Sequence, residues 1–117
     1  MKEIVTIIRP EKLEILKTVL EEVSTGGMTI STVMGCGTQK GRTEPPGVTE
    51  IKGIKTNINL LPKIKVEVVV NDKDVEKIVL EIQEKCASGH VGDGKIFVKK
   101  VEDVIRIRTG ERGSRAI

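Results

Sequence analysis

Apolar residues in the first third of the chain predict a strand, a helix and a second strand. The β-branched run from Lys2 to Ile8 is typical of a strand. A helix is expected to begin at Pro10, because proline is favoured in a first helical turn, and to end before Gly26. The apolar stripe of this helix consists of Leu13, Leu16, Leu20 and Val23. The run from Met28 to Met34 predicts the second strand.

The last half of the chain repeats these patterns. Apolar and polar side chains alternate from Ile64 to Val70, which predicts a third strand. Asn71 and Asp72 are cap-type residues for a second helix. The apolar stripe of that helix consists of Val75, Ile78, Val79, Ile82 and Cys86. A fourth strand is predicted from Lys95 to Val101, and a further extended segment from Val104 to Arg108.

The element order β-α-β-β-α-β predicts an α+β fold of the ferredoxin-like type, with one antiparallel sheet and two helices on one face. A single domain is expected over residues 1–117. The segment from Cys36 to about Leu61 has no sustained apolar period and contains Pro45-Pro46-Gly47, so we expect a long exposed loop here. The uncovered sheet face includes apolar residues such as Val69, and such a face favours a homo-oligomer.

Composition narrows the class of protein. The chain has 117 residues and a net charge of +3, with 20 Lys and Arg against 17 Asp and Glu. Phe97 is its only aromatic residue, which disfavours nucleic-acid binding, where stacking platforms are usual. No apolar run reaches the roughly 18 residues of a membrane span, and the first residues lack a secretory pattern. Cys36 and Cys86 form no metal-type spacing, so a cytoplasmic protein is expected.

A glycine-rich loop follows the second predicted helix and reads S-G-H-V-G-D-G-K-I-F-V from Ser88 to Val98. Glycines leave backbone N–H groups accessible, and such groups can converge on an anion. Lys95 adds a positive charge where the loop ends. The alternative is a helix C-cap at Gly89 followed by a tight turn. The loop is not a P-loop, because the spacing G-x-x-x-x-G-K-[ST] is absent.

Two further features are compatible with binding of a small anion. Arg106 and Arg108 are separated by one residue in a segment expected to be extended, so both guanidinium groups would point to one side and could bind a polyphosphate. The alternative is an exposed basic strand face. A second glycine cluster, G-C-G-T-Q-K-G from Gly35 to Gly41, could hold an anion or complete a metal shell, although hinges have the same composition.

Catalytic groups are not apparent in the sequence. His90 is the single histidine, and its place in a glycine loop favours a solvated residue over a general base. No paired carboxylates, Ser-His-Asp set or metal-ligand cluster occurs, so the chain is not expected to be an enzyme.

Several motifs together resemble the PII signal-transduction proteins, trimeric sensors of nitrogen and energy status. The resemblance runs from K-E-I-V-T-I-I-R-P-E-K-L through G-C-G-T-Q-K-G and L-P-K-I-K-V-E-V-V-V. Its most specific parts are S-G-H-V-G-D-G-K-I-F-V and I-R-I-R-T-G-E-R-G. These two segments look like the B-loop, at about 87–95, and the C-loop, at about 106–115. The long segment at about 37–56 would be the T-loop, through which target proteins are controlled.

The resemblance implies a homotrimer that binds ATP or ADP in clefts between subunits, with Arg106 and Arg108 supplied by the neighbouring subunit. The implied nucleotide-binding residues are Ile7, Met28, Thr29, Gly35, Gly37, Thr38, Gln39, Val69, Gly92, Asp93, Gly94, Lys95, Arg106 and Arg108. By the same resemblance, 2-oxoglutarate binds only with Mg-ATP, and Gln39 coordinates the Mg²⁺. The residues implied for 2-oxoglutarate are Gly37, Gln39, Lys40, Gly41 and Lys63.

The chain also departs from the family pattern. Thr38 stands where the family commonly has arginine, which puts one phosphate contact in doubt. The chain has no tyrosine, so uridylylation of a T-loop tyrosine cannot occur. The unusual T-loop sequence weakens the expectation of an ammonium transporter as target, and a nitrogen-assimilation enzyme is the other expected class. Alternatives are an adenylate sensor with a different small effector, or a weak ATP hydrolase on the same fold.

Overall fold

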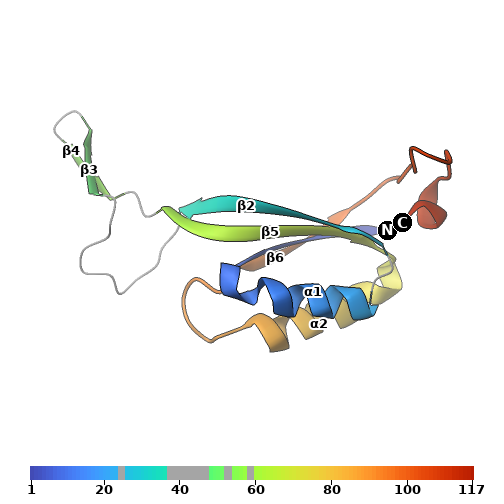
Figure 1. Cartoon of the computed structure of the whole chain (residues 1–117), viewed down its shortest axis with the longest axis horizontal. Coiled ribbons are helices and arrows are strands. Elements are labelled where there is room, and N and C mark those ends of the chain that lie inside the picture. Colours follow the sequence, from blue (N-terminus) through green and yellow to red (C-terminus); the bar gives the residue numbers. More distant parts are fainter. Residues whose placement is uncertain (24–25, 37–47, 52–53, 58–59) are drawn as a thin grey trace.

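The chain folds around one four-stranded antiparallel sheet that mixes early and late parts of the sequence. The computed structural model describes residues 1–23, 26–36, 48–51, 54–57 and 60–117 (Figure 1). The strands lie in the order β2 (Met28–Cys36), β5 (Leu60–Val70), β1 (Lys2–Ile8) and β6 (Lys95–Lys100). Each neighbouring pair is antiparallel. This arrangement, with two helices, confirms the predicted ferredoxin-like α+β fold.

Both helices follow a short 3₁₀ turn and lie on the same side of the sheet (Figure 1). The elements are the turn Pro10–Lys12, α1 (Leu13–Val23), the turn Asp72–Asp74 and α2 (Val75–Cys86). Asn71 precedes the second turn with an extended backbone, but its side chain makes no capping hydrogen bond, so the side-chain cap expected there was wrong. Its carbonyl oxygen instead accepts the N–H of Asp74 at 3.0 Å. No helix in the described part of the chain is long and apolar enough to cross a membrane.

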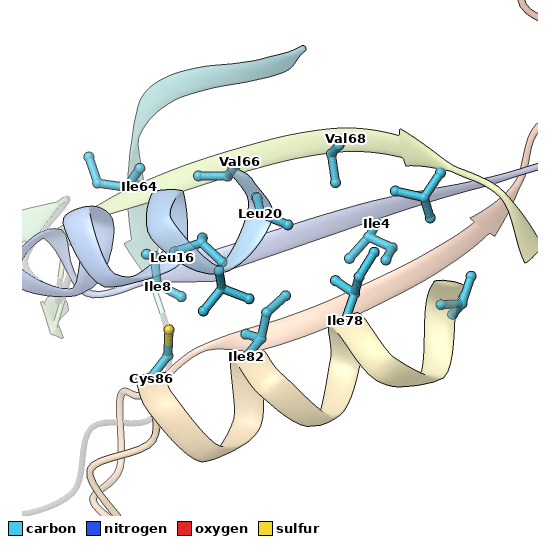
Figure 2. Packing of buried hydrophobic residues seen from close by; sticks show 13 residues of the cluster. Ile4, Ile8, Leu16, Leu20, Ile64, Val66, Val68, Ile78, Ile82 and Cys86 are labelled. Atoms are coloured by element: carbon cyan, nitrogen blue, oxygen red, sulfur yellow. The ribbon is translucent and has the colours of Figure 1, made fainter. Parts of the chain in front are cut away.

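The core lies between the helices and one face of the sheet. Figure 2 shows Ile4 and Ile8 of β1 pointing toward Ile78 and Ile82 of α2. The buried cluster consists of Ile4, Ile8, Leu16, Val19, Leu20, Ile64, Val66, Val68, Val70, Val75, Ile78, Ile82 and Cys86. The remaining predicted stripe residues, Leu13, Val23 and Val79, are partly buried against it. Both apolar stripes therefore face the core, as their helical spacing predicts.

The opposite face of the sheet carries no helix in the described structure (Figure 1). Side chains alternate along a strand, so the odd-numbered residues of β1 and β5 point to this face. These residues are Glu3, Val5, Ile7, Leu61, Lys63, Lys65, Glu67 and Val69. The face therefore mixes apolar and charged groups, and it includes Val69 as the alternation predicts.

The segment between β2 and β5 contains strand structure that the sequence pattern did not predict. β3 (Val48–Ile51) and β4 (Ile54–Asn57) form an antiparallel hairpin, with Val48 opposite Asn57. β2 and β5 also pair beyond their predicted ends, with Cys36 opposite Leu60. The sequence pattern predicted a long exposed loop between Cys36 and Leu61 and did not identify this hairpin. Four-residue strands are too short to produce a sustained period, and partner pairing extends β5 through Pro62.

Leu16 and Leu80 allow the contribution of the core to be measured with the same chemical change. Leu16 of α1 is fully buried, whereas Leu80 of α2 is 56% exposed. We expect Leu16→Ala to lower the free energy of unfolding by ~2–5 kcal/mol, because it leaves a cavity between helix and sheet. Leu80→Ala should cost less than about 1 kcal/mol. Urea denaturation of both variants at one protein concentration checks this, and equal losses would contradict the described core.

Candidate functional site

A cleft lies on the uncovered face of the sheet, beside the glycine loop that joins α2 to β6. Its volume is about 360 Å³. Its lining consists of Ile7, Gly35, Cys36, Leu61, Lys63, Val91, Gly92, Gly94, Lys95 and Phe97. The cleft therefore brings together predicted site residues from all four strands and the loop. Those residues are Ile7, Gly35, Lys63, Gly92, Gly94 and Lys95.

Two glycines of the cleft pack closely against other parts of the chain, and one of them, Gly94, is required by this contact. Gly94 has a φ of 103°, and a Cβ at this position would lie 1.7 Å from the carbonyl oxygen of Ile7. Any side chain at Gly94 would therefore separate the loop from β1. A Cβ at Gly35 would lie 3.2 Å from Cγ of Lys63, whose side chain crosses this position. Close packing of the chain on itself thus explains Gly94, whereas Lys63 would have to move slightly for a side chain at Gly35; contact of either glycine with a ligand stays a prediction.

The carboxylate of Asp93 organises the loop from within. One of its oxygens, Oδ2, accepts the N–H groups of Ser88 and Gly89 at 2.8 and 2.9 Å. Its Oδ1 accepts the Ser88 hydroxyl and lies 3.4 Å from Nε of Arg9. Hydrogen bonds from the Ser88 hydroxyl and N–H, with those from Gly89 and Arg9, hold the pKa of Asp93 well below its usual range. The N–H groups at the start of the loop therefore surround the chain's own carboxylate, and not a space open to a ligand.

Two cations hold the middle of the loop by its carbonyl oxygens. Nη2 of Arg9 donates to the carbonyl oxygen of Val91 at 2.6 Å. Nζ of Lys63 donates to that of Gly92, also at 2.6 Å. Burial lowers the pKa of Lys63, and the charge of Arg9 lowers it further, while Glu11 and Asp93 act in the opposite direction. Lys63 therefore lines the cleft with its ammonium group bonded to the loop, and its contact with 2-oxoglutarate stays a prediction.

Arg9 and Phe97 are parts of this site that the sequence analysis missed. Arg9 contacts residues more than 80 positions away, since Val91 follows it by 82 residues, and no local pattern indicates such a contact. Phe97 and Leu61 form apolar parts of the cleft wall. Phe97 could have been predicted, because it follows Lys95 by two residues on a strand and therefore shares its face.

A second, smaller cleft lies at the other end of the same face. Its volume is about 240 Å³, and it includes Thr29 and Val69. The other lining residues are Glu3, Gly26, Gly27, Glu67, Val68, Val104, Ala116 and Ile117. Met28, next to Thr29, is partly buried against the core on the opposite face. One copy of the chain therefore does not bring Thr29 and Val69 into the cleft beside the glycine loop.

The two arginines of the C-terminal segment lie in a turn. Ile105 forms an isolated bridge with Arg112, and the N–H of Gly110 donates to the carbonyl oxygen of Arg106 at 2.8 Å. The expectation of an extended segment through Arg108 was wrong, because the chain reverses at residues 107–109. Nη2 of Arg106 donates to the carbonyl oxygen of Ile117 at 3.3 Å, while Arg108 is exposed. Strand alternation therefore does not set the directions of these two side chains.

The second glycine cluster lies largely outside the described residues. The predictions that fall there concern Gly37, Thr38, Gln39, Lys40 and Gly41. The predicted magnesium ligand, Gln39, is among them. Within the residues that the structure does describe, no three His, Cys, Asp or Glu side chains are grouped to hold a metal ion. His90 is exposed in the glycine loop, which agrees with the prediction of a solvated residue.

Comparison with known proteins identifies close relatives over the whole chain. A family model described as nitrogen regulatory protein P-II matches residues 1–111. A nitrogen regulatory protein P-II 2 from Methanothermobacter thermautotrophicus is 50% identical, covering all of this chain and 97% of the relative. Nitrogen regulatory proteins P-II from Azospirillum brasilense and Nostoc punctiforme are 46% and 44% identical, with all of both chains covered. The matches to these relatives therefore include the residues that line both clefts.

The contact between Gly94 and β1 can be tested against a second glycine of the same loop. Gly89 also has a positive φ, of 84°, but a Cβ there would meet nothing within 4 Å. We expect Gly89→Ala to lower the free energy of unfolding by ~1–2 kcal/mol, from backbone strain alone. Gly94→Ala should cost clearly more, because its methyl group must displace Ile7. Chemical denaturation measures the difference, and equal losses of stability in the two variants would contradict the close contact between Gly94 and Ile7.

The carboxylate of Asp93 should make stability depend on pH. Its folded-state pKa lies below that of the unfolded chain, so its stabilisation is complete above the ordinary Asp pKa of about 3.9 and is lost as pH falls further. Asp93→Asn should therefore be less stable than wild type at pH 7, and this difference should shrink from about pH 5 towards pH 2. Denaturation at several pH values tests this, with exposed Glu21→Gln as control. A difference that does not change with pH would contradict the prediction.

Proposed function

Because this chain belongs to the nitrogen regulatory protein P-II family, we propose that it is a regulator of nitrogen metabolism that senses the ratio of ATP to ADP. The cleft beside the glycine loop supports this proposal. It combines two lysines, Lys63 and Lys95, with an apolar wall that includes Phe97 and Ile7. Lysines can bind phosphates, and apolar walls suit a base. The relatives carry regulatory names, and we propose that this protein is likewise not an enzyme.

We propose a homotrimer because the predicted nucleotide-binding residues are divided between two clefts of one copy. Lys63 and Val69 lie on one strand, six positions apart (63 to 69), which is about 20 Å along the strand. A single nucleotide therefore cannot closely contact both the Lys63 end and the Val69 end of one copy. In a cyclic assembly, however, the end with Thr29 and Val69 can face the glycine loop of the next copy. Arg106 and Arg108 would come from the copy that supplies Thr29 and Val69, because Arg106 bonds Ile117 beside that cleft, and would complete the phosphate site on the glycine loop of the other copy.

Lys63 links this site to the proposed second effector, 2-oxoglutarate. The Lys63 ammonium group can exchange the carbonyl oxygen of Gly92 for a carboxylate, which is a stronger partner for a cation. We propose that Gln39 coordinates Mg²⁺ between ATP and the keto acid, and that the backbone around Gly37, Lys40 and Gly41 completes the pocket. Binding would then change the T-loop, at about 37–56, and so the affinity for a target protein in the cytoplasm.

Two other functions remain as alternatives with distinct outcomes. An adenylate sensor would bind ATP and ADP but respond to a different small effector. A weak hydrolase would release ADP from ATP continuously. The target could be an ammonium transporter or a nitrogen-assimilation enzyme.

Nucleotide binding is tested first with Lys95 and Arg106. We expect Lys95→Ala or Arg106→Ala to weaken ATP binding at least tenfold, since a lost charge-assisted bond to phosphate costs ~1.5–3 kcal/mol. Lys100→Ala is the matched control, because it removes a lysine from the other end of β6. Titration calorimetry measures all three variants, and size-exclusion chromatography should show the same oligomer throughout. Wild-type affinity for ATP in both test variants would contradict the proposed nucleotide site.

The response to 2-oxoglutarate is tested by hydrogen exchange over residues 36–64 in the free protein and with ADP, Mg-ATP, or Mg-ATP plus 2-oxoglutarate. We expect added protection near residues 37–41 only in the last state, because metal and keto acid then hold this segment. Gln39→Ala and Lys63→Ala should abolish the increment. Lys65→Ala, on the same strand and face as Lys63, should retain it.

Outcomes of this experiment separate the three functions. Equal protection with and without the keto acid would favour the pure adenylate sensor. Steady release of ADP from ATP at ordinary enzyme turnover would favour the hydrolase.

A further inference from the structure

We infer that Arg9 is a positioning residue that sets the conformation of the loop Ser88–Asp93, and through this loop the affinity of the cleft for an anionic ligand. Arg9 follows β1 directly, so its backbone is held by the central part of the sheet. Its guanidinium group reaches two separate points of the loop, the carbonyl oxygen of Val91 at 2.6 Å and Oδ1 of Asp93 at 3.4 Å. The ligand readout rests on the proposed function, whereas the loop readout does not.

The loop needs an external support of this kind. Gly89 and Gly92 in the loop, and Gly94 directly after it, have positive φ values, so the unfolded loop has many accessible conformations and its ordering is costly. The hydrogen bonds from Ser88 and Gly89 to Asp93 are local and do not attach the loop to the sheet. Arg9 makes that attachment from β1, and Lys63 makes it from β5 through Gly92.

Arginine is suited to this position by its geometry. A guanidinium group has several N–H donors in a fixed plane, so one side chain can bond a carbonyl and a carboxylate together. The side chains of Arg9 and Asp93 are each 24% exposed, so the pair is largely shielded from solvent. Lysine would retain the charge but could not reproduce the planar, two-point contact.

A ligand in the cleft would change the bonding of Lys63 but not that of Arg9. Lys63 lines the cleft, so a bound anion can take over its ammonium group. Arg9 is not among the residues that line this cleft. Arg9 can therefore continue to hold Val91 and Asp93 when Lys63 has left Gly92, which would keep the loop in place while the ligand binds.

The test compares Arg9→Gln, Arg9→Lys and wild type by hydrogen exchange of the ligand-free protein and by ATP titration. Arg9→Gln should speed exchange of the amides of Ser88 and Gly89 at least tenfold and weaken ATP binding about tenfold. Arg9→Lys should fall between wild type and Arg9→Gln in both measurements. Lys17→Gln, which removes an exposed cation on α1, is the control and should change neither.

A double-mutant cycle identifies the route of the effect. If Arg9 acts through Asp93, the loss of ATP affinity in the variant with both Arg9→Gln and Asp93→Asn should be smaller than the product of the single losses. Unchanged exchange in the ligand-free Arg9→Gln protein would overturn the inference, even if ATP binding weakened, because that pattern means direct contact with the ligand. If wild type and Lys17→Gln bind no nucleotide, the proposed function fails, and the exchange result alone still decides the role of Arg9.

Discussion

The alternation of side chains along β1 and β5 is the constraint on which both the core and the candidate site depend. These strands lie at the centre of the sheet, and their even-numbered residues pack against the helices. Their odd-numbered residues point to the uncovered face, where Ile7 and Lys63 line the cleft. A shift of one residue in register would move apolar core residues to the surface and remove the lysine from the cleft. The burial of Ile4, Ile8 and Ile64 therefore also positions the polar groups on the other face.

Charged side chains of the chain itself fix the conformation of the glycine loop. Asp93 gathers the N–H groups of Ser88 and Gly89, and Arg9 and Lys63 bind the next carbonyl oxygens. Gly94 then returns the chain to the sheet in contact with Ile7. Because the loop is held from both sides, it can border a ligand site with little further loss of entropy on binding.

The same sheet face also explains why a regulator of this type would work as an oligomer. Its two clefts lie at opposite ends, one with Lys63 and the other with Val69. In the proposed trimer, a nucleotide would bind between one end of a subunit and the opposite end of the next. Both subunits would then contact its phosphates. A change in the bound nucleotide would then alter contacts on both sides of the interface, which couples the sites.

Much of the fold was determined by the sequence alone. The β-branched run at Lys2–Ile8, period-two alternation at Ile64–Val70 and helical spacing at Leu16 and Ile78 were enough to predict the layers of the fold. The reason is that burial of apolar side chains is periodic and local in sequence. The glycine loop was singled out from its glycines and Lys95, and Lys63 from a family resemblance; both line the cleft, and their contacts with a ligand stay predictions.

Tertiary structure decided how these groups are used. The pairing of Cys36 with Leu60 extended both strands, and the turn at 107–109 ended the expected extended segment with Arg106 and Arg108. The bond from Arg9 to Val91 joins positions 82 residues apart. Local patterns contain no information about such partners, because a hydrogen bond across the fold depends on where the packed strands bring the two ends. For the same reason, only the folded chain shows that Asp93 is bonded to its own loop.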